Sequence, residues 1–303
     1  MTPPAWTRVP ERGATWAMRS LLFALNILGY GAARMLLFPI VAYFVFSGAR
    51  SRRASRNYLA KLHRFDRSAP KPTLFQVYLH HLEFAQTLLE RVLLWQGKLE
   101  KFQFTGSGKD LLERQGNIGC LLLGAHFGSF DVLRVVAKDL KCRVNVVMYR
   151  AHALRINKFL EELNPDANLR VVELNPGDIE GILQLKTCIE QGEHVAILAD
   201  RLAPAARQRI SKAKFLGSDA PFPESPWLIA NIFNCPVIFV TAARTGARSY
   251  QISVELFAEQ IQRQPSNLAS HIQEFARRLE ILCLRHPRQW FNFYDFWSGD
   301  ETT

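Results

Sequence analysis

Paired cysteines are missing from this sequence. Its 303 residues include only five cysteines, an odd number, and no two of them form a CxxC pair. Neither a disulfide framework nor a cysteine-based metal site is therefore expected. Several of the five lie within apolar runs, which is typical of packed cysteines in a reducing compartment. They are Cys120, Cys142, Cys188, Cys235 and Cys283.

Other absences narrow the class of protein further. No internal repeat or low-complexity tract is visible, and no G-x-S-x-G nucleophile elbow occurs. Hydrophobic residues make up 48% and charged residues 21%, which is ordinary for a folded protein with a sizeable core. The length fits one large domain or two small ones. Disorder is not expected outside the two ends.

Acidic residues are scarce relative to basic ones. There are 38 Lys and Arg against 27 Asp and Glu, which gives a net charge of +11. Such an excess suits an anionic membrane surface, an acidic carrier protein or a nucleic acid. The basic residues gather directly after an apolar stretch, and this placement favours a membrane with anionic lipids over nucleic acid. The run consists of Arg50, Arg52, Arg53, Arg56, Lys61, Arg64 and Arg67.

The apolar stretch before this run, residues 20–46, is the main targeting feature. A spanning helix needs roughly 20 apolar residues, and the stretch is long enough, although Asn26 and Arg34 interrupt it. No small-residue cleavage site like that of a secretory signal follows it. We expect an uncleaved anchor that either spans the bilayer or lies in its cytoplasmic face; the alternative is a buried core helix. The basic run places the rest of the chain in the cytoplasm.

After the anchor the apolar periodicity changes along the chain. Residues 52–64 and 72–95 are predicted to be helices, and residues 266–285 a closing helix. Between them, continuous apolar runs alternate with segments of helical periodicity, which predicts a mostly parallel sheet flanked by helices. The predicted strands are 102–105, 118–123, 144–148, 169–172, 195–198 and 237–241, and the predicted helices are 109–115, 128–140, 153–163, 178–191 and 224–234.

The fold class is therefore α/β, with an N-terminal hydrophobic helical membrane anchor ahead of the sheet. We expect three parts: an anchor over residues 1–50, a basic helical membrane-proximal region over 51–98, and the α/β domain over 99–303.

Polar residues follow three of the predicted strands. In an open parallel sheet, ligands bind beyond the carboxyl ends of the strands. These residues should therefore share one edge of the sheet and form a candidate site. They are His126 and Asp131 after the strand at 118–123, Arg150 after the strand at 144–148, and Asp200 with Arg201 after the strand at 195–198.

His126 and Asp131 are a candidate catalytic pair. On a regular helix, residues five apart lie about 140° from each other and do not meet. If His126 lies in a loop made flexible by Gly124 and Gly128, its ring can fold back over Asp131. The carboxylate could then fix the tautomer and leave the other ring nitrogen as a general base. The alternative is a helix-capping histidine beside a solvated aspartate.

Residues 126–131, HFGSFD, resemble the HxxxxD signature of the lysophospholipid and glycerolipid acyltransferase superfamily. The order around the motif is similar too: VVMYR and ILADR follow later strands, and a proline leads the strand that starts after Cys235. The ending from Pro287 to Tyr294 resembles the Pro/Gln/Trp segment that closes the lipid A late acyltransferase branch. That branch includes enzymes of aryl-polyene and xanthomonadin-type pathways. The resemblance covers nearly the whole chain.

The resemblance implies a mechanism and a location. His126 would remove a proton from an acceptor hydroxyl or amine while Asp131 orients the imidazole, and the acceptor would attack an acyl thioester directly, with no acyl-enzyme, metal or cofactor. Main-chain N–H groups at the start of the helix at 128–140 would stabilise the oxyanion. The donor would be acyl carrier protein or acyl-CoA, and the acceptor lipid-like. The setting would be the cytoplasmic face of a bacterial inner membrane. The expected substrate-binding residues are Arg150, Asp200, Arg201, Gly128 and Ser129.

The chain departs from the glycerolipid enzymes at one block, and two alternative functions stay open. Glycerolipid enzymes carry a Phe-Pro-Glu-Gly-like block where this chain has Ala199-Asp200-Arg201, so a glycerol-phosphate acceptor is not expected. A serine hydrolase or thioesterase using Ser129 and His126 is one alternative, although the nucleophile elbow is absent. The other is a membrane-bound accessory protein that kept the fold and lost activity. The aromatic residues at 290–297 could line an acyl pocket, lie at the membrane interface or pack in the core.

Overall fold

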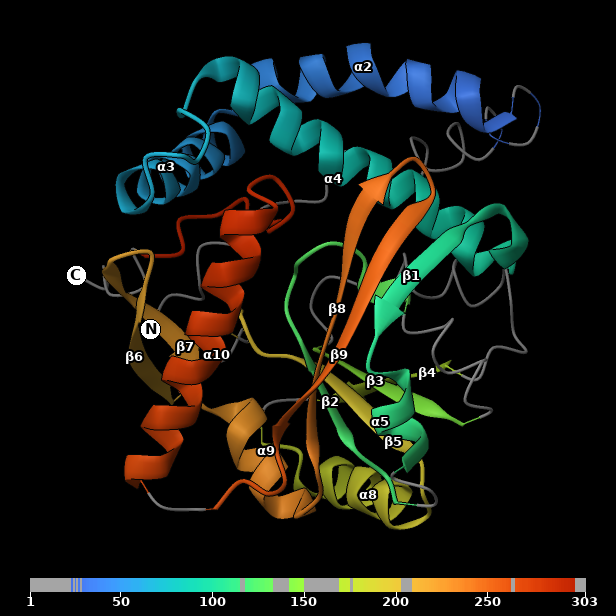
Figure 1. Ribbon diagram of the computed structural model, residues 1–303, viewed down its shortest axis with the longest axis vertical. Helices are drawn as coiled ribbons and strands as arrows, with labels where there is room; N and C mark the ends of the chain where they lie inside the picture. The colour runs from blue at the N-terminus through green and yellow to red at the C-terminus, as the bar shows by residue number, and fades with distance from the viewer. Residues whose placement is uncertain are drawn as a thin grey trace.

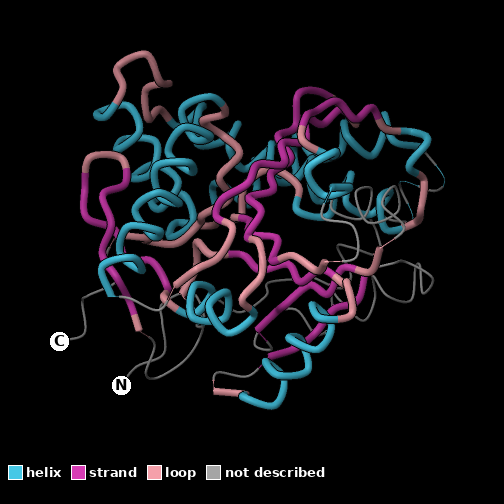
Figure 2. The backbone as a smooth tube through the Cα atoms, turned by 60° about the horizontal axis from the view of Figure 1, so that its bottom comes forward, coloured by secondary structure: helices cyan, strands magenta, loops and turns pink. Residues whose placement is uncertain are grey.

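The computed structural model describes residues 23, 25, 27, 29–114, 118–132, 142–149, 169–174, 177–202, 209–262 and 265–297. In this part of the chain a seven-stranded sheet lies below a layer formed by helices α2, α3 and α4 in the view of Figure 1. Figure 2 shows the strands running through the middle of the molecule with helices on both sides. The mixed α/β fold expected from the sequence is confirmed.

The sheet is mostly parallel, as predicted. Its strands run in the order β1-β9-β8-β2-β5-β3-β4. Every neighbouring pair is parallel except β8 with β9. The strands are β1 (Gln103–Ser107), β2 (Leu121–Gly124), β3 (Val144–Tyr149), β4 (Leu169–Leu174), β5 (His194–Leu198), β8 (Val237–Gly246) and β9 (Ser249–Ala258).

Strand β2 lies between β8 and β5 at the centre of the sheet, with Leu121 opposite both Val237 and Val195. All four of its residues are buried. A strand with both neighbours paired and both faces covered has no side for polar residues, which explains its continuous apolar run. The same register places Gly124 opposite Leu198 of β5. The chain segments that follow these two strands therefore leave the sheet side by side.

Strand β9 was not predicted from the sequence. Its buried residues Tyr250, Ile252 and Val254 alternate with more exposed ones. This is the pattern of a strand with only one covered face, and the predictions rested on continuous apolar runs. The strand forms a long hairpin with β8 and brings its other edge to β1.

A second, two-stranded sheet was also missed. Strands β6 (Ile210–Phe215) and β7 (Ser218–Pro223) form an antiparallel hairpin. Its turn residues, Leu216 and Gly217, both have positive φ angles, which suits the twist of a two-residue hairpin. Helix α10 (Pro265–Arg285) runs beside this hairpin (Figure 1), and Glu280 accepts a hydrogen bond of 2.6 Å from the main-chain N of Leu216.

Most of the predicted helices agree with the structure where it describes them, but the described start of the segment at 128–140 is not an α-helix. Segments 153–163 and 133–140 lie outside the described residues. The described part of the segment at 128–140 is a 3-10 turn, η3 (Phe130–Val132). The others correspond to α3 (Ala49–Phe65), α4 (Leu74–Trp95), α5 (Lys109–Arg114), α8 (Ile179–Glu190), α9 (Ser225–Phe233) and α10.

Helix α2 (Gly29–Ser47) lies along α4 at the outer edge of the molecule (Figure 1). Its buried residues Ala33, Leu37, Val41 and Val45 recur every fourth position, so they form one stripe on the helix. Arg52 of α3 donates hydrogen bonds of 2.6 and 2.8 Å to the carbonyls of Val45 and Phe46. These carbonyls lack helical partners at the end of α2, so Arg52 holds the corner between the two helices.

By length and composition alone, α2 is apolar enough to cross a membrane. Its buried side chains belong to the same hydrophobic cluster as the central strand β2 and helix α10. The helical layer and the sheet thus share one core. The division at residues 50 and 98 stays a prediction.

Candidate functional site

The candidate site is built around the loop that follows β2. Phe291 donates its main-chain N–H to the carbonyl of His126 over 2.8 Å, and Gly128 donates to the carbonyl of Gln289 over 2.8 Å. On the other side, Ser129 donates to the carbonyl of Ala242 in β8 over 3.0 Å. The loop is therefore held between β8 and the C-terminal segment at residues 289–291, and its geometry does not depend on a regular helix.

Gly128 is required at the closest approach of this loop to β8. Its φ angle is +57°, and a Cβ atom there would lie 1.9 Å from the carbonyl oxygen of Ala242. Any side chain would have to displace the main chain of the sheet. The structure thus assigns Gly128 a role in the backbone. The N–H groups of Gly128 and Ser129, expected to stabilise an oxyanion, already donate to main-chain carbonyls.

Asp200 holds His126 at two points. The ring Nδ1 of His126 lies 2.8 Å from Oδ1 of Asp200, and the main-chain N–H of His126 donates to Oδ2 over 3.0 Å. Trp290 donates its indole N–H to the same Oδ2 over 2.9 Å. The side chain of Asp200 is 1% exposed and that of His126 is 29% exposed. The Nδ1 edge of the imidazole is therefore fixed inside the protein, while another part of the ring is exposed.

The charges around the ring favour a neutral imidazole beside an ionised carboxylate. Burial lowers the pKa of His126, and the positive charge of Arg201 lowers it further, against the opposing effect of Asp200. Burial alone would raise the pKa of Asp200, but His126, Arg201 and the indole N–H of Trp290 bring it down to about 2. Near neutral pH, Nδ1–H of His126 donates to Asp200, and no described residue bonds to Nε2. Nε2 can then accept a proton.

Asp131 does not contact the imidazole, contrary to the expectation from the sequence. Its Oδ1 accepts the indole N–H of Trp95 over 2.7 Å, and its Oδ2 lies 2.9 Å from Nε of Arg91. Both partners belong to α4. Asp131 sits in the 3-10 turn η3, which directs its carboxylate toward this helix. The expectation of a His126–Asp131 contact is therefore corrected: the carboxylate on the ring is Asp200, from the strand next to β2.

The other predicted site residues are only partly brought together. Arg201 donates a hydrogen bond of 2.5 Å from Nη2 to the carbonyl of Phe291, and its guanidinium lies 5.7 Å from the ring centre of Tyr294. No hydrogen bond joins Asp200 to Arg201; they interact only through their charges. Arg150 lies outside the described residues.

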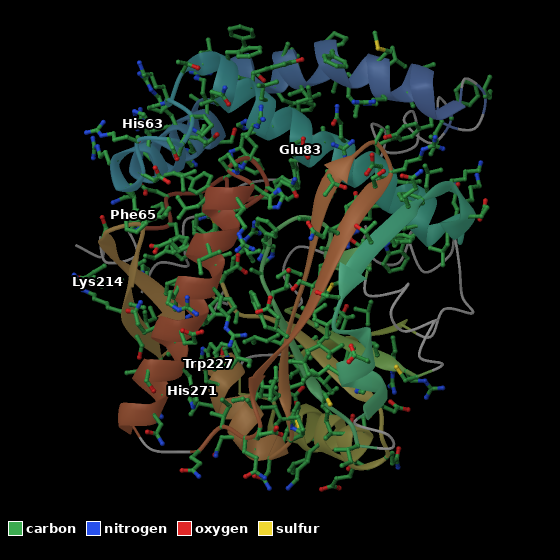
Figure 3. All side chains as sticks on the ribbon, viewed as in Figure 1. His63, Phe65, Glu83, Lys214, Trp227 and His271 are labelled. Atoms are coloured by element: carbon green, nitrogen blue, oxygen red, sulfur yellow. The ribbon has the colours of Figure 1, made fainter. Side chains whose placement is uncertain are left out.

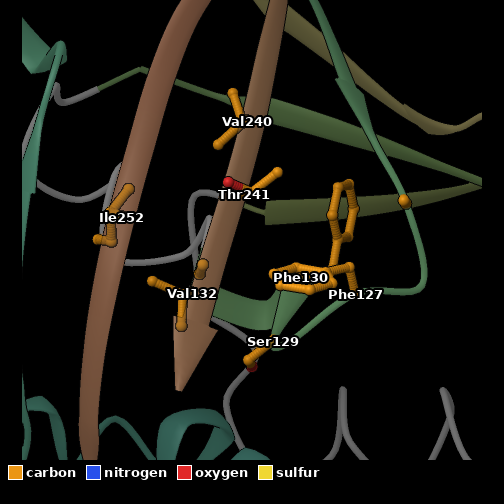
Figure 4. A pocket seen from close by; sticks show the side chains of 9 residues that line it. Phe127, Ser129, Phe130, Val132, Val240, Thr241 and Ile252 are labelled. Carbon is orange, nitrogen blue, oxygen red and sulfur yellow. The ribbon is translucent and has the colours of Figure 1, made fainter. Parts of the chain in front are cut away.

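Ser129 lies beside an apolar pocket next to the loop (Figure 4). Its hydroxyl is buried and has no hydrogen-bond partner among the described residues. The pocket wall is apolar apart from Ser129 and Thr241; its other residues are Ala125, Phe127, Phe130, Val132, Val240, Ala242 and Ile252.

A buried ionic cluster supports the site from the side of α4. Glu90, fully buried, accepts hydrogen bonds of 3.0 and 2.9 Å from Nε and Nη2 of Arg244 in β8, and one of 2.6 Å from Tyr250. Glu83, labelled in Figure 3, pairs with Nη1 of the same arginine over 3.2 Å. The side chain of Gln289 in turn bonds both main-chain groups of Arg244, over 2.7 and 2.6 Å. The cluster thus connects α4 and β8 to the segment that holds the His126 loop.

Three residues of the site were not predicted from the sequence. The closing Pro/Gln/Trp segment was noted, but not that Trp290 would reach Asp200. A packing role was one of the three weighed for this segment, and the structure shows it for Trp290 and Phe296, which are buried. Arg91 and Trp95 lie one helical turn apart on α4, and no local pattern marks them as partners of Asp131. Among the described residues, no group of three or more His, Cys, Asp or Glu is arranged to hold a metal ion.

Together, the fold and this site define an α/β protein that presents a carboxylate-bound imidazole at the carboxyl edge of a mostly parallel sheet. The profile of the family described as bacterial lipid A biosynthesis acyltransferase matches residues 5–298 of the chain. The chain belongs to this family, which confirms the resemblance to the lipid A late acyltransferase branch and indicates an acyltransferase. No curated protein matches the chain in the corresponding comparison.

Proposed function

We propose that this protein transfers a fatty acyl group from a carrier thioester to a hydroxyl or amine of a lipid-like acceptor, with His126 as the general base. One observation carries the proposal. In a chain of an acyltransferase family, the buried carboxylate of Asp200 holds Nδ1 of His126 over 2.8 Å, while the ring stays partly exposed. This is the arrangement that a base needs when it must receive a proton on Nε2 from a bound substrate.

The imidazole of His126, stabilised by Asp200, accounts for both proton transfers in the proposed reaction. Nε2 of His126 takes the proton of the acceptor O–H or N–H as that oxygen or nitrogen bonds to the thioester carbonyl carbon. The C–S bond then breaks, and the leaving thiolate takes the proton from the imidazolium. Asp200 stays ionised throughout and stabilises the imidazolium between these two steps. Arg201 and Arg150 enter the proposal as cations for an anionic part of the substrate.

Acyl carrier protein is the proposed donor, since its acidic surface would suit the net charge of +11; acyl-CoA is the other candidate. Purified protein incubated with a labelled acyl donor and membrane lipid extract tests the activity. Label should pass to a lipid, and the same protein with His126→Ala should leave the lipid unlabelled.

The proposed location is the cytoplasmic face of a bacterial inner membrane, with α2 lying in the interface. One stripe of α2 is buried against the protein, whereas Met35, Tyr43 and Phe46 are 67–70% exposed. A helix that spanned the bilayer would give up the contacts of that stripe. The basic run begins in α3 directly beside this apolar surface and would face anionic headgroups. Phe65, labelled in Figure 3, is another exposed aromatic residue and lies at the end of α3.

A further inference from the structure

Asp131 occupies the last position of the HxxxxD motif, yet both of its described partners are on α4. Trp95 donates to one oxygen over 2.7 Å, and Arg91 pairs with the other over 2.9 Å. Residues four apart on a helix lie on the same face, so the carboxylate spans one turn of α4. Trp95 is fully packed, with 1% of its surface exposed. This contact therefore fixes where α4 presents Arg91.

Asp131 follows His126 by five residues, so its ion pair with Arg91 brings this arginine to the chain segment that carries the ring. Besides burial, the positive charges of Arg201 and Arg91 lower the pKa of His126. Arg201 donates a hydrogen bond to the carbonyl of Phe291. In contrast, Arg91 lies against Asp131 through its inner nitrogen Nε, and 25% of its side chain is exposed. A guanidinium has five N–H donors, so the outer end of Arg91 can receive an anion while Asp131 holds the inner end.

We propose that Arg91 binds an anionic group of the acceptor, a phosphate or carboxylate, beside His126, and that Asp131 is the positioning residue that orients Arg91 for this contact. The proposal rests on the acyl transfer proposed above and names a feature of its acceptor. A donor thioester also brings a phosphate, but the long pantetheine arm separates that phosphate from the reacting carbonyl. An arginine held by Asp131, in the segment that carries the base, is therefore better placed for the acceptor.

Binding of an anion can be measured at His126 without any turnover. The probe is dodecyl phosphate, titrated into the full-length protein in dodecyl maltoside, with the pKa of His126 followed by NMR of histidine-labelled protein. The signal of His126, one of eight histidines, is the one that disappears in His126→Ala. A phosphate bound to Arg91 would offset the positive charge near the ring, so we expect the pKa of His126 to rise as the probe saturates its site.

Three variants separate the roles. Arg91→Gln should raise the pKa of His126 in the free protein and weaken probe binding about tenfold or more, as expected when a charge-assisted hydrogen bond is lost. Asp131→Asn should weaken binding less, since Arg91 keeps its charge but loses its orientation. Arg143→Gln is the matched control. It removes an arginine that pairs with Glu193 on the surface, and it should change neither quantity.

Three results would overturn the proposal. The first is a response to dodecyl phosphate that persists unchanged in Arg91→Gln, and the second is no response in the unmodified protein. The third comes from comparing CoA with pantetheine. If CoA binds at lower concentration than dodecyl phosphate, and pantetheine has no effect, the anion at Arg91 belongs to the donor. Because no acyl transfer is needed, these results are independent of whether the proposed acyltransferase activity is found.

Discussion

His126 and Asp200 are joined by two hydrogen bonds, one from the ring Nδ1 at 2.8 Å and one from the main-chain N at 3.0 Å. They are 74 residues apart in the sequence, and the register of the sheet brings them together. Gly124 and Leu198 are paired at the ends of β2 and β5, and each of the two residues comes two positions later. Ala199 continues the pairing with a hydrogen bond of 3.0 Å to the carbonyl of Gly124.

The first prediction concerns the order of importance of the two aspartates. His126→Ala should reduce acyl transfer by roughly 10²–10⁴-fold, the contribution of a positioned base. Asp200→Asn should come close to this loss, because an amide cannot hold the ring tautomer or stabilise the imidazolium. Asp131→Asn should also lower activity, but less. Single-turnover rates with purified variants check the order, and His271→Ala, on α10 (Figure 3), serves as the control. A larger loss in Asp131→Asn than in Asp200→Asn would restore Asp131 as the partner of the base.

The second prediction is the pH dependence of transfer. His126 must be neutral to act as a base, and its pKa is lowered by burial and by Arg201 and Arg91. Activity should therefore persist below the ordinary histidine pKa of about 6.5 and fall only as the pH drops through the lowered value. Arg91→Gln removes one of the lowering charges, so its acid limb should shift to higher pH. The profile of kcat/KM against pH measures both positions. An unshifted acid limb in Arg91→Gln would mean that this arginine does not act on the base.

The third prediction concerns stability. Glu90 is fully buried and receives a bidentate contact from Arg244. Arg244→Met would leave its carboxylate without a countercharge, and breaking a buried pair in this way costs roughly 3–5 kcal/mol of folding free energy. Denaturant unfolding followed by tryptophan fluorescence measures the loss. Arg277→Met, which breaks an exposed pair with Glu274 on α10, should leave the midpoint nearly unchanged. Equal midpoints for both variants would contradict the buried cluster.

The fourth prediction tests the membrane surface of α2. Replacing Met35, Tyr43 and Phe46 by serine should weaken sedimentation with vesicles that contain anionic lipids, since these side chains are 67–70% exposed. Folding should be kept, because the buried stripe of α2 is untouched. High salt should loosen the unmodified protein by screening the arginines of α3. Ile179→Ser, at a position 71% exposed on α8, is the control. A spanning helix would instead hold the protein on the vesicles at high salt.

The fifth prediction separates direct transfer from an acyl-enzyme. The buried hydroxyl of Ser129 has no partner among the described residues, and no hydrogen bond connects it to His126. Ser129→Ala should therefore be mild, a change of about 1 kcal/mol or less. Intact-mass measurement after incubation with acyl donor alone should show unmodified protein. An acyl adduct that is lost in Ser129→Ala would establish a serine nucleophile instead.

Much of the fold could be predicted from local patterns. Continuous apolar runs predicted the central parallel strands because these strands are covered on both faces, as the fully buried β2 shows. Helical periodicity predicted α3, α4 and α10 for a similar reason, since a helix needs one apolar face. The strand β9 was missed because its alternating residues depend on which face the rest of the protein covers.

For the site, the sequence by itself determined that an imidazole, carboxylates and arginines would follow the ends of neighbouring parallel strands, since that depends only on strand direction. Which carboxylate meets the imidazole was decided by the tertiary structure. The register between β2 and β5 carries Asp200 to His126, and the 3-10 turn after the loop directs Asp131 to Arg91 and Trp95 of α4. Register and helix placement follow from packing among distant segments. The five-residue spacing between His126 and Asp131 could therefore predict neither of them.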